Sequence, residues 1–479
     1  MSKIESFEVE NPPNYLERKH SDFYDDEEDN KSFNNSSIND YEEKNRNSLD
    51  INNNNENNNN NNDKNSNNKK SFNSFTEENQ IYGILNLLAS VIGAGCVTFP
   101  SLLQTAGVIT SLLIFSIVSI SIYFSLDLLR NFVITTRVFS FAGIIQNILG
   151  ISFLKIYAFS SVIFYLSIEV NYINLIVEYA GKAFFVIEKT YLWIIFYLVT
   201  CVIEILLCFF TSKISHVHIL SLISVLCFIF IVIVVIIYSF GSFKKENLKD
   251  KFVNNMFMPP SDSIIKFIMS IFSCFIEYLY SYACHSSFPT LIRNLKPEKT
   301  KKVVNIFFIS TAIMYFIISI FGYISQINVD DQKKTIILFT DNESLQSFFN
   351  KILEIVITIF FLCLIPIRFI VIRDNYSSIL PFKITNEIEL TFISVNIIIA
   401  NVISYFCTID SNIIFSLNEI FGGIFGVVIC FVLPVLTHAL ISNKCEKKSI
   451  LGYIMAGFFL IIGIFTAIYS FLEKILKVI

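Results

Sequence analysis

The stretch SVIGAGCVTFP, residues 90–100, places two glycines and a proline inside an apolar run long enough to cross a membrane. A helix in hydrocarbon must satisfy its own backbone hydrogen bonds, because lipid offers no partners. A break at the glycines would expose backbone N–H groups, which bind carboxylates well. The expected substrate-binding residues are therefore Ile92, Gly93, Ala94 and Gly95. The alternative is that the glycines only let a neighbouring helix approach closely.

A second apolar run, IIKFIMSIFSCFIEYLYSYACHSSFP at 264–289, carries Glu277 near its middle and ends abruptly between His285 and Pro289. An ionisable side chain inside a membrane is costly and is a functional candidate by default. We expect Glu277 to bind the ammonium group of a substrate or to carry a coupling proton. The adjacent Tyr278 is expected to bind substrate as well. The alternative is an inert carboxyl group hydrogen-bonded between helices.

Other polar side chains also interrupt apolar runs. Glu169 and Asn171 lie in SIEVNYIN and are further intramembrane candidates. For Glu204 we expect a hydrogen bond to a neighbouring helix. Arg368 lies near the end of its apolar run, so its side chain is expected to reach the membrane surface. His285 is expected to cap a helix end.

The elements that carry these residues are membrane-spanning helices. The chain has 479 residues, 53% of them hydrophobic, and a mean hydropathy of +0.58, which is too apolar for a soluble globule. About eleven runs of 18 or more residues have the length of a transmembrane helix. They are 82–103, 107–129, 154–177, 191–211, 217–240, 264–284, 303–325, 351–372, 389–407, 413–436 and 450–472. The predicted fold class is an all-α polytopic membrane protein.

The first and the sixth of these runs are the interrupted ones, five helices apart. This spacing predicts an inverted repeat of five helices in which each copy begins with a discontinuous helix. Half-helix ends at the middle of the membrane carry partial charges of both signs. The breaks therefore suit a ligand that has both a carboxylate and an ammonium group.

Residues 1–80 form a separate region, which contains INNNNENNNNNND at 51–63. This tail has 18 acidic and nine basic residues and little apolar surface, so we expect it to be disordered. Met1 begins a hydrophilic stretch, so the first apolar run is expected to act as the insertion signal. Thirteen Lys and Arg in inward loops against eight in outward loops favour a cytoplasmic tail. The transporter domain is expected over 81–479.

Several classes of protein are disfavoured by what the sequence contains. The ten cysteines show no C-x-x-C pair and lie mostly within apolar runs, so neither disulfides nor a metal site is expected. No phosphate-binding Gly-rich loop with a lysine occurs, which disfavours a nucleotide-driven pump. An intramembrane aspartyl protease would need two aspartates in adjacent spans, and Asp127 and Asp410 both lie near span ends. A membrane-embedded acyltransferase using His285 is the remaining enzymatic alternative.

Four motifs resemble those of the amino acid/auxin permease family, in the order of that family. They are NLLASVIGAGCVTFPSLLQTAG at 86–107, YACHSSFPTLIRNLKPEKTKK at 282–302, FLCLIPIR at 361–368 and IFGGIFGVVICFVLPVLTHA at 420–439. The resemblance covers about 81–472. It implies a LeuT-type fold of five plus five plus one helices and secondary transport of amino acids. It also implies that the third span, with Glu169 and Asn171, lines the site.

Two departures from the family bear on the coupling ion. Sodium-coupled relatives tend to have asparagine where this chain has Ala89, and a hydroxyl near Ile359, where only Thr358 is available. Thr358 is therefore the expected coupling residue beside Glu277, and proton-coupled symport or facilitated exchange is favoured over sodium coupling.

The resulting prediction is a secondary transporter of free amino acids in the plasma membrane or a vacuolar or lysosomal membrane. The protein is not expected to be an enzyme, to need a cofactor or to bind nucleic acid; its partners are the substrate, protons and the lipid bilayer. The alternative is an amino acid sensor on the same fold without net flux. A sugar or nucleoside facilitator would favour twelve helices and a long central loop, which the sequence lacks.

Overall fold

The structure is a computed structural model, and its described part is helical. It describes residues 80–93, 95–184, 190–211, 214–242, 252–257, 264–293, 295–326, 345–379, 386–409 and 420–442, and single residues between 454 and 468. The chain divides into two units, Met1–Thr76 and Glu77–Ile479, and every described residue belongs to the second. The predicted tail therefore lies outside the described residues except for Gln80.

Helices account for the predicted apolar runs. They are Gln80–Val91, α4 (Gly95–Ala106), α5 (Val108–Thr136), α7 (Ile151–Phe184), α8 (Thr190–Phe210), α9 (Ile214–Ser242), α11 (Ile264–Tyr282), α13 (Pro297–Gln326), α14 (Leu345–Ile379) and α15 (Asn386–Ile409). Among the described residues, seven helices are long and apolar enough to cross a membrane. The shorter apolar helices are Gln80–Val91, Phe267–Tyr282 and Gly422–His438. The predicted all-α, polytopic class is confirmed.

The short apolar helices belong to the predicted first, sixth and tenth spans. The first span is divided into Gln80–Val91 and α4, and the sixth into α11 and the single turn α12 (Phe288–Leu291). The tenth span consists of two π-helical turns, η2 (Gly422–Gly426) and η3 (Val428–Val432), followed by α17 (Leu433–Ser442). Single-turn π-helical segments occur most often at functional sites.

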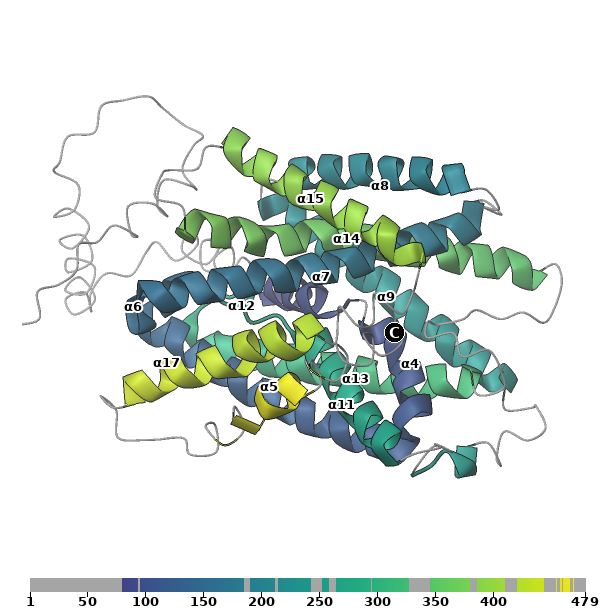
Figure 1. Cartoon of the computed structure of the whole chain (residues 1–479), viewed down its shortest axis with the longest axis horizontal. Coiled ribbons are helices and arrows are strands. Elements are labelled where there is room, and N and C mark those ends of the chain that lie inside the picture. Colours follow the sequence, from purple (N-terminus) through teal and green to yellow (C-terminus); the bar gives the residue numbers. More distant parts are fainter. Residues whose placement is uncertain are drawn as a thin grey trace, which may run out of the picture. The chain divides into compact units, whose positions relative to one another are not determined.

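The described helices lie in two layers (Figure 1). The first layer holds α7, α8, α14 and α15, which pack against one another, and the second holds α4, α5, α11 and α13. Helices five positions apart in the expected order also pack together: α4 with α11, α5 with α13, α7 with α14 and α8 with α15. Such counterpart pairing agrees with an internal repeat of five helices.

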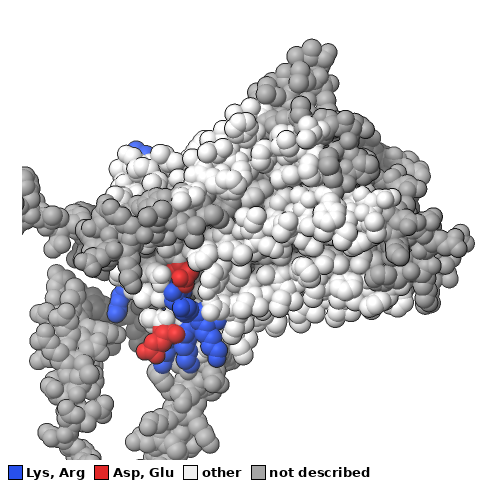
Figure 2. All heavy atoms as spheres, turned by 90° about the horizontal axis from the view of Figure 1, so that it is seen from below, with Lys and Arg blue, Asp and Glu red and all other residues white. Residues whose placement is uncertain are grey.

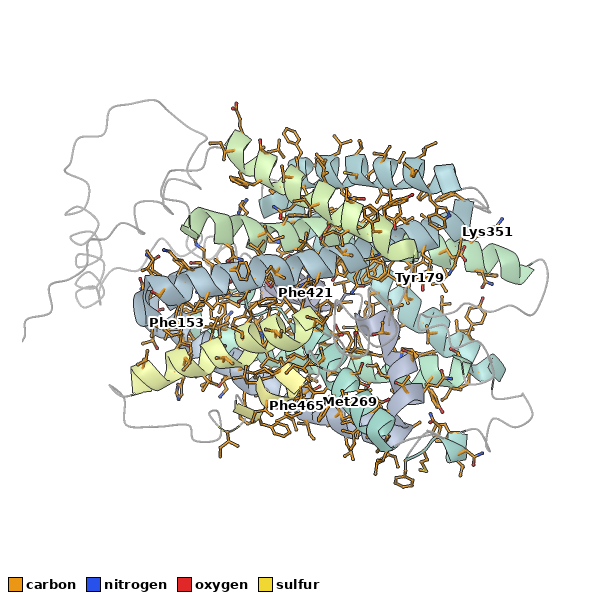
Figure 3. All side chains as sticks on the ribbon, in the orientation of Figure 1. Phe153, Tyr179, Met269, Lys351, Phe421 and Phe465 are labelled. Carbon is orange, nitrogen blue, oxygen red and sulfur yellow. The ribbon has the colours of Figure 1, made fainter. Side chains whose placement is uncertain are left out.

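The outside of the helices is apolar, as a lipid-facing surface requires. Exposed side chains include Phe153, Phe209 and Phe465, whereas Tyr179 is fully buried between helices (Figure 3). Figure 2 shows a wide uncharged surface, with the visible Lys, Arg, Asp and Glu side chains gathered at one end of the described part. An uncharged flank with charged side chains toward the ends of the helices is expected of a protein embedded in a bilayer.

Two features of the helices differ from the sequence prediction. Helix α6 (Phe141–Leu149) lies between α5 and α7 in a segment for which no helix was expected, and Ser140 caps its N-terminus by accepting from Gly143 N–H at 3.0 Å. Helix α14 extends to Ile379, beyond the predicted end at 372. Most of the predicted eleventh span, 450–472, and the start of the tenth lie outside the described residues.

Candidate functional site

The two helix breaks lie side by side and share one stabilising side chain. The last bond of the first half-helix joins Ile92 N–H to Leu88 C=O at 2.9 Å. The Tyr315 hydroxyl of α13 lies 3.0 Å from the carbonyl of Val91 and 3.1 Å from that of Ser281, so its single O–H can donate to either freed carbonyl and links the two breaks. A broken helix in a membrane is tolerated where neighbouring helices satisfy its backbone in this way.

The glycines at the first break also allow very close packing. An added Cβ at Gly93 would lie 2.1 Å from the Tyr172 hydroxyl oxygen, and one at Gly95 would lie 1.5 Å from Ser281 Oγ and 3.1 Å from Ser281 Cα. Both distances to side-chain oxygens are far below van der Waals contact. Glycine at these two positions therefore lets Tyr172 of α7 and Ser281 of α11 pack directly against the backbone of the break.

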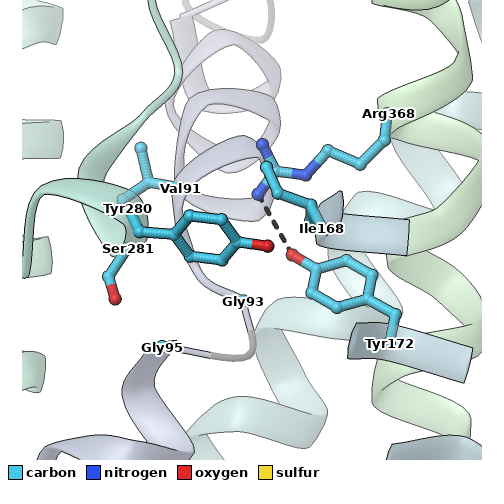
Figure 4. A pocket seen from close by; sticks show the side chains of 8 residues that line it. All are labelled: Val91, Gly93, Gly95, Ile168, Tyr172, Tyr280, Ser281 and Arg368. Carbon is cyan, nitrogen blue, oxygen red and sulfur yellow. Dashed lines mark hydrogen bonds between the residues drawn. The ribbon is translucent and has the colours of Figure 1, made fainter. Parts of the chain in front are cut away.

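A small cavity, with room for about one water molecule, lies at the breaks, between the two layers of helices (Figure 4). Eight residues line it: Val91, Gly93, Gly95, Ile168, Tyr172, Tyr280, Ser281 and Arg368. The volume is below the roughly 300–1,000 Å³ of most ligand pockets. A ligand with a bulky side chain would therefore require the two layers to move apart.

Arg368 supplies the positive charge of this cavity. Its side chain is 4% exposed, and its guanidinium donates from Nη2 to the Tyr172 hydroxyl at 3.1 Å and from Nη1 to the carbonyl of Ala283 at 3.5 Å. Its Nε–H has no partner among the described residues, and no described carboxylate forms an ion pair with it. A buried cation with no carboxylate bonded to it directly is unfavourable, so this site favours an anionic ligand.

The residues predicted from the sequence fall in different places around the breaks. Gly93 and Gly95 line the cavity, and Ile92 is buried beside it without lining it. Ala94 lies outside the described residues. Glu277 is buried one turn before Ser281 on α11, where its carbonyl accepts from Ser281 Oγ at 2.7 Å, and its carboxylate does not line the cavity.

The two other predicted hydroxyls are engaged outside the cavity. Tyr278 is hydrogen-bonded to Ser111 Oγ at 2.7 Å and its ring packs on Phe99. Thr358 donates to the carbonyl of Glu354 at 2.8 Å, within its own helix. The roles assigned to Glu277, Tyr278 and Thr358 therefore remain predictions.

Sequence reasoning missed the side chains that α7 and α14 contribute. The predicted end of the apolar run at 372 places Arg368 near the membrane surface, but α14 continues to Ile379 and the guanidinium turns inward. An arginine within an apolar run was the available signal. Tyr172 and Tyr280 had no such signal among the 21 tyrosines of the chain.

Other intramembrane polar residues lie away from the cavity. Asn401 on α15 donates to Glu204 Oε2 at 2.8 Å, so the predicted hydrogen bond of Glu204 to a neighbouring helix is confirmed. His285 lies in the sixth-span break, with its Nε2 3.1 Å from Ser125 Oγ on α5. No group of three potential metal-ligating side chains occurs in the described part of the chain.

Comparison with known proteins identifies the family. A family model described as "Transmembrane amino acid transporter protein" matches residues 77–476, almost the whole helical unit. The chain belongs to this family of transmembrane amino acid transporters. The resemblance seen in the four motifs is thereby confirmed, and the chain is a multi-pass membrane protein of a transporter family.

The comparison with solved structures gives a more distant likeness. One similar structure is described as the substrate-bound outward-open state of a Na+-coupled sialic acid symporter; it is 12% identical, covers 82% of this chain and 96% of that chain, and has a TM-score of 0.44. No curated protein matches the sequence.

Proposed function

We propose that this transporter carries amino acids across its membrane by proton-coupled symport or facilitated exchange, and that the cavity at the two helix breaks binds the substrate. The observation that carries the proposal is the unpaired Arg368 guanidinium facing the Gly93 break. The α-carboxylate of an amino acid supplies the missing negative charge.

Arg368 has N–H groups left over to bind this carboxylate. A guanidinium has five N–H groups, and Arg368 uses two of them on Tyr172 and Ala283. The Nε–H and the remaining Nη–H groups can bind a carboxylate in a bidentate manner without breaking those bonds. Gly93 lies in the same cavity and lets ligand atoms approach the backbone closely.

The position of the cavity between two layers suits alternating access. Gly93, Gly95 and Ser281 belong to the layer of α4 and α11, whereas Tyr172 and Arg368 belong to the layer of α7 and α14. Rocking of one layer against the other would open the cavity to either side of the membrane. A substrate bound to both layers would then be released when they separate.

The test is an uptake screen with purified protein in liposomes, over the twenty amino acids, with and without an imposed proton gradient. We expect saturable uptake of a subset of amino acids, and loss of uptake in Gly93→Val and Gly95→Val protein that still reaches the membrane. Normal transport by both valine variants would contradict the proposed site. Saturable binding without accumulation or exchange would instead favour a sensor.

A further inference from the structure

A second polar site lies behind the cavity, within the layer of α7, α8 and α15. Glu169 on α7 is 1% exposed, and neither of its carboxylate oxygens has a hydrogen-bond partner among the described residues. It follows Ile168 and precedes Tyr172 by one turn, and both of these line the cavity. An ionised carboxylate with no hydrogen-bond donor in a membrane interior is strongly disfavoured.

Glu204 and Asn401 complete this site from the neighbouring helices. Glu204 on α8 is 0% exposed, and its Oε1 has no partner, while its Oε2 accepts from the Asn401 amide. The Asn401 side chain is itself buried, and its Oδ1 is also without a partner. The Asn401 amide therefore satisfies one oxygen of Glu204, while its own oxygen and the other oxygen of Glu204 have no hydrogen-bond partner among the described residues.

Helix register brings Glu169 and Glu204 to the same depth. The Tyr197 hydroxyl of α8 donates to Asn174 Oδ1 of α7 at 2.9 Å, which aligns the two antiparallel helices. Glu169 comes five residues before Asn174 on α7, and Glu204 comes seven residues after Tyr197 on α8. Because the two helices are antiparallel, both carboxylates are displaced from this contact in the same direction along the helix axes, by about 7 and 10 Å. The two carboxylates therefore lie at a similar depth on neighbouring helices.

The surroundings of this pair are apolar, with few other charges. Val170, Ile173, Tyr197 and Ala400 form the buried cluster where the three helices meet. Arg368 from α14 reaches this part of α7 by donating to the Tyr172 hydroxyl, one turn from Glu169. The residue that α15 contributes, Asn401, does not titrate.

We infer that Glu169 and Glu204 form the proton-binding site of this transporter, with one proton shared between the two carboxylates. The proton bonds to an oxygen of one of the two carboxylates, so the pair retains a single negative charge. Two buried carboxylates on neighbouring helices, with three of their four oxygens lacking a hydrogen-bond partner among the described residues, cannot both remain ionised in a membrane interior without a large penalty. Asn401 stabilises the carboxylate that stays ionised, by donating to Glu204.

Arg368 connects this site with the substrate cavity. Arg368 donates to Tyr172, one turn from Glu169, so its positive charge lies between the substrate cavity and this site. A substrate carboxylate on Arg368 would offset that charge, so substrate and proton would bind together. This inference rests on the proposed function for the identity of the substrate, but the proton site itself can be tested without transport.

Infrared difference spectroscopy of the purified wild-type protein is the first test. We expect an absorption band of a protonated carboxyl group that changes on addition of a transported amino acid and is absent from Glu169→Gln or Glu204→Gln protein. Glu178→Gln is the matched control, because Glu178 lies on the same helix but is exposed and paired with Lys182 at 2.5 Å. A carboxyl band that survives in both Glu169→Gln and Glu204→Gln protein would overturn the assignment.

Transport gives the second test. Glu169→Gln protein should lose accumulation driven by a proton gradient and retain exchange of substrate across the membrane, whereas the Glu178→Gln control should accumulate normally. Wild-type accumulation by Glu169→Gln protein would overturn the inference while leaving the proposed transport intact. A requirement for Na+ together with an unchanged carboxyl band would show that the site holds a metal cation and not a proton.

Discussion

Replacing Arg368 by methionine tests whether the buried guanidinium binds the substrate carboxylate. Methionine has a similar length and no charge, so it removes the cation while filling most of its space. The structure gives Arg368 one unpartnered Nε–H and only two neutral partners, Tyr172 and Ala283. A bidentate carboxylate would add two charge-assisted hydrogen bonds of about 1.5–3 kcal/mol each.

The expected loss follows from these two bonds. Losing at least about 3 kcal/mol of binding free energy reduces affinity roughly 150-fold. Thermal stability should change little in Arg368→Met protein, because replacing a buried charge that has no direct ion pair by an apolar side chain is often neutral or stabilising. Arg368→Lys should restore part of the affinity, since lysine supplies the charge without the bidentate geometry.

Direct binding of labelled amino acid to detergent-solubilised protein, with thermal unfolding in parallel, measures both quantities. Arg373→Met is the control, because Arg373 lies on the same helix but pairs with Glu389 at 3.4 Å. The control should bind substrate like the wild type. Unchanged affinity in Arg368→Met protein, or a fall in affinity matched by a fall in stability, would refute the reasoning.

Three further predictions concern the breaks and the tail. Gly95→Ala should destabilise the protein by about 1–3 kcal/mol, because its Cβ would overlap Ser281; a second substitution, Ser281→Ala, should recover only part of this in thermal unfolding, since Ser281 Cα is also 3.1 Å away. Glu277→Gln should lower substrate affinity measured in exchange, because Glu277 lies one turn from Ser281 on the same face of α11; unchanged affinity with lost accumulation would instead make it a proton carrier. Removal of residues 1–75 should leave uptake per correctly localised molecule nearly unchanged, and a large loss would assign the tail to gating.

The breaks were predictable because they depend on residue types that act locally. Gly93 and Gly95 weaken a helix wherever they occur in an apolar run, and His285 to Pro289 end the sixth span within the sequence itself. The observed ends at Val91 and Tyr282 follow from those residues. The counterpart pairing of helices was likewise implied by the positions of the two interrupted runs.

The cavity lining was less predictable because it depends on which way a helix face turns. Arg368 and Tyr172 meet across α7 and α14, nearly two hundred residues apart in sequence, and no local pattern specifies that contact. Glu169 and Glu204 were visible as costly intramembrane carboxylates, but their common depth depends on the register set by Tyr197 and Asn174. Residue type therefore indicated candidates, and tertiary packing decided which of them share a site.

The central claim is that the cavity at the two breaks holds the substrate by its carboxylate. A cryo-electron microscopy structure of the transporter saturated with a transported amino acid tests it most directly. We predict the ligand carboxylate within hydrogen-bond distance of the Arg368 guanidinium and beside the backbone of Gly93. A ligand bound elsewhere, or bound here with its carboxylate turned away from Arg368, would contradict the account.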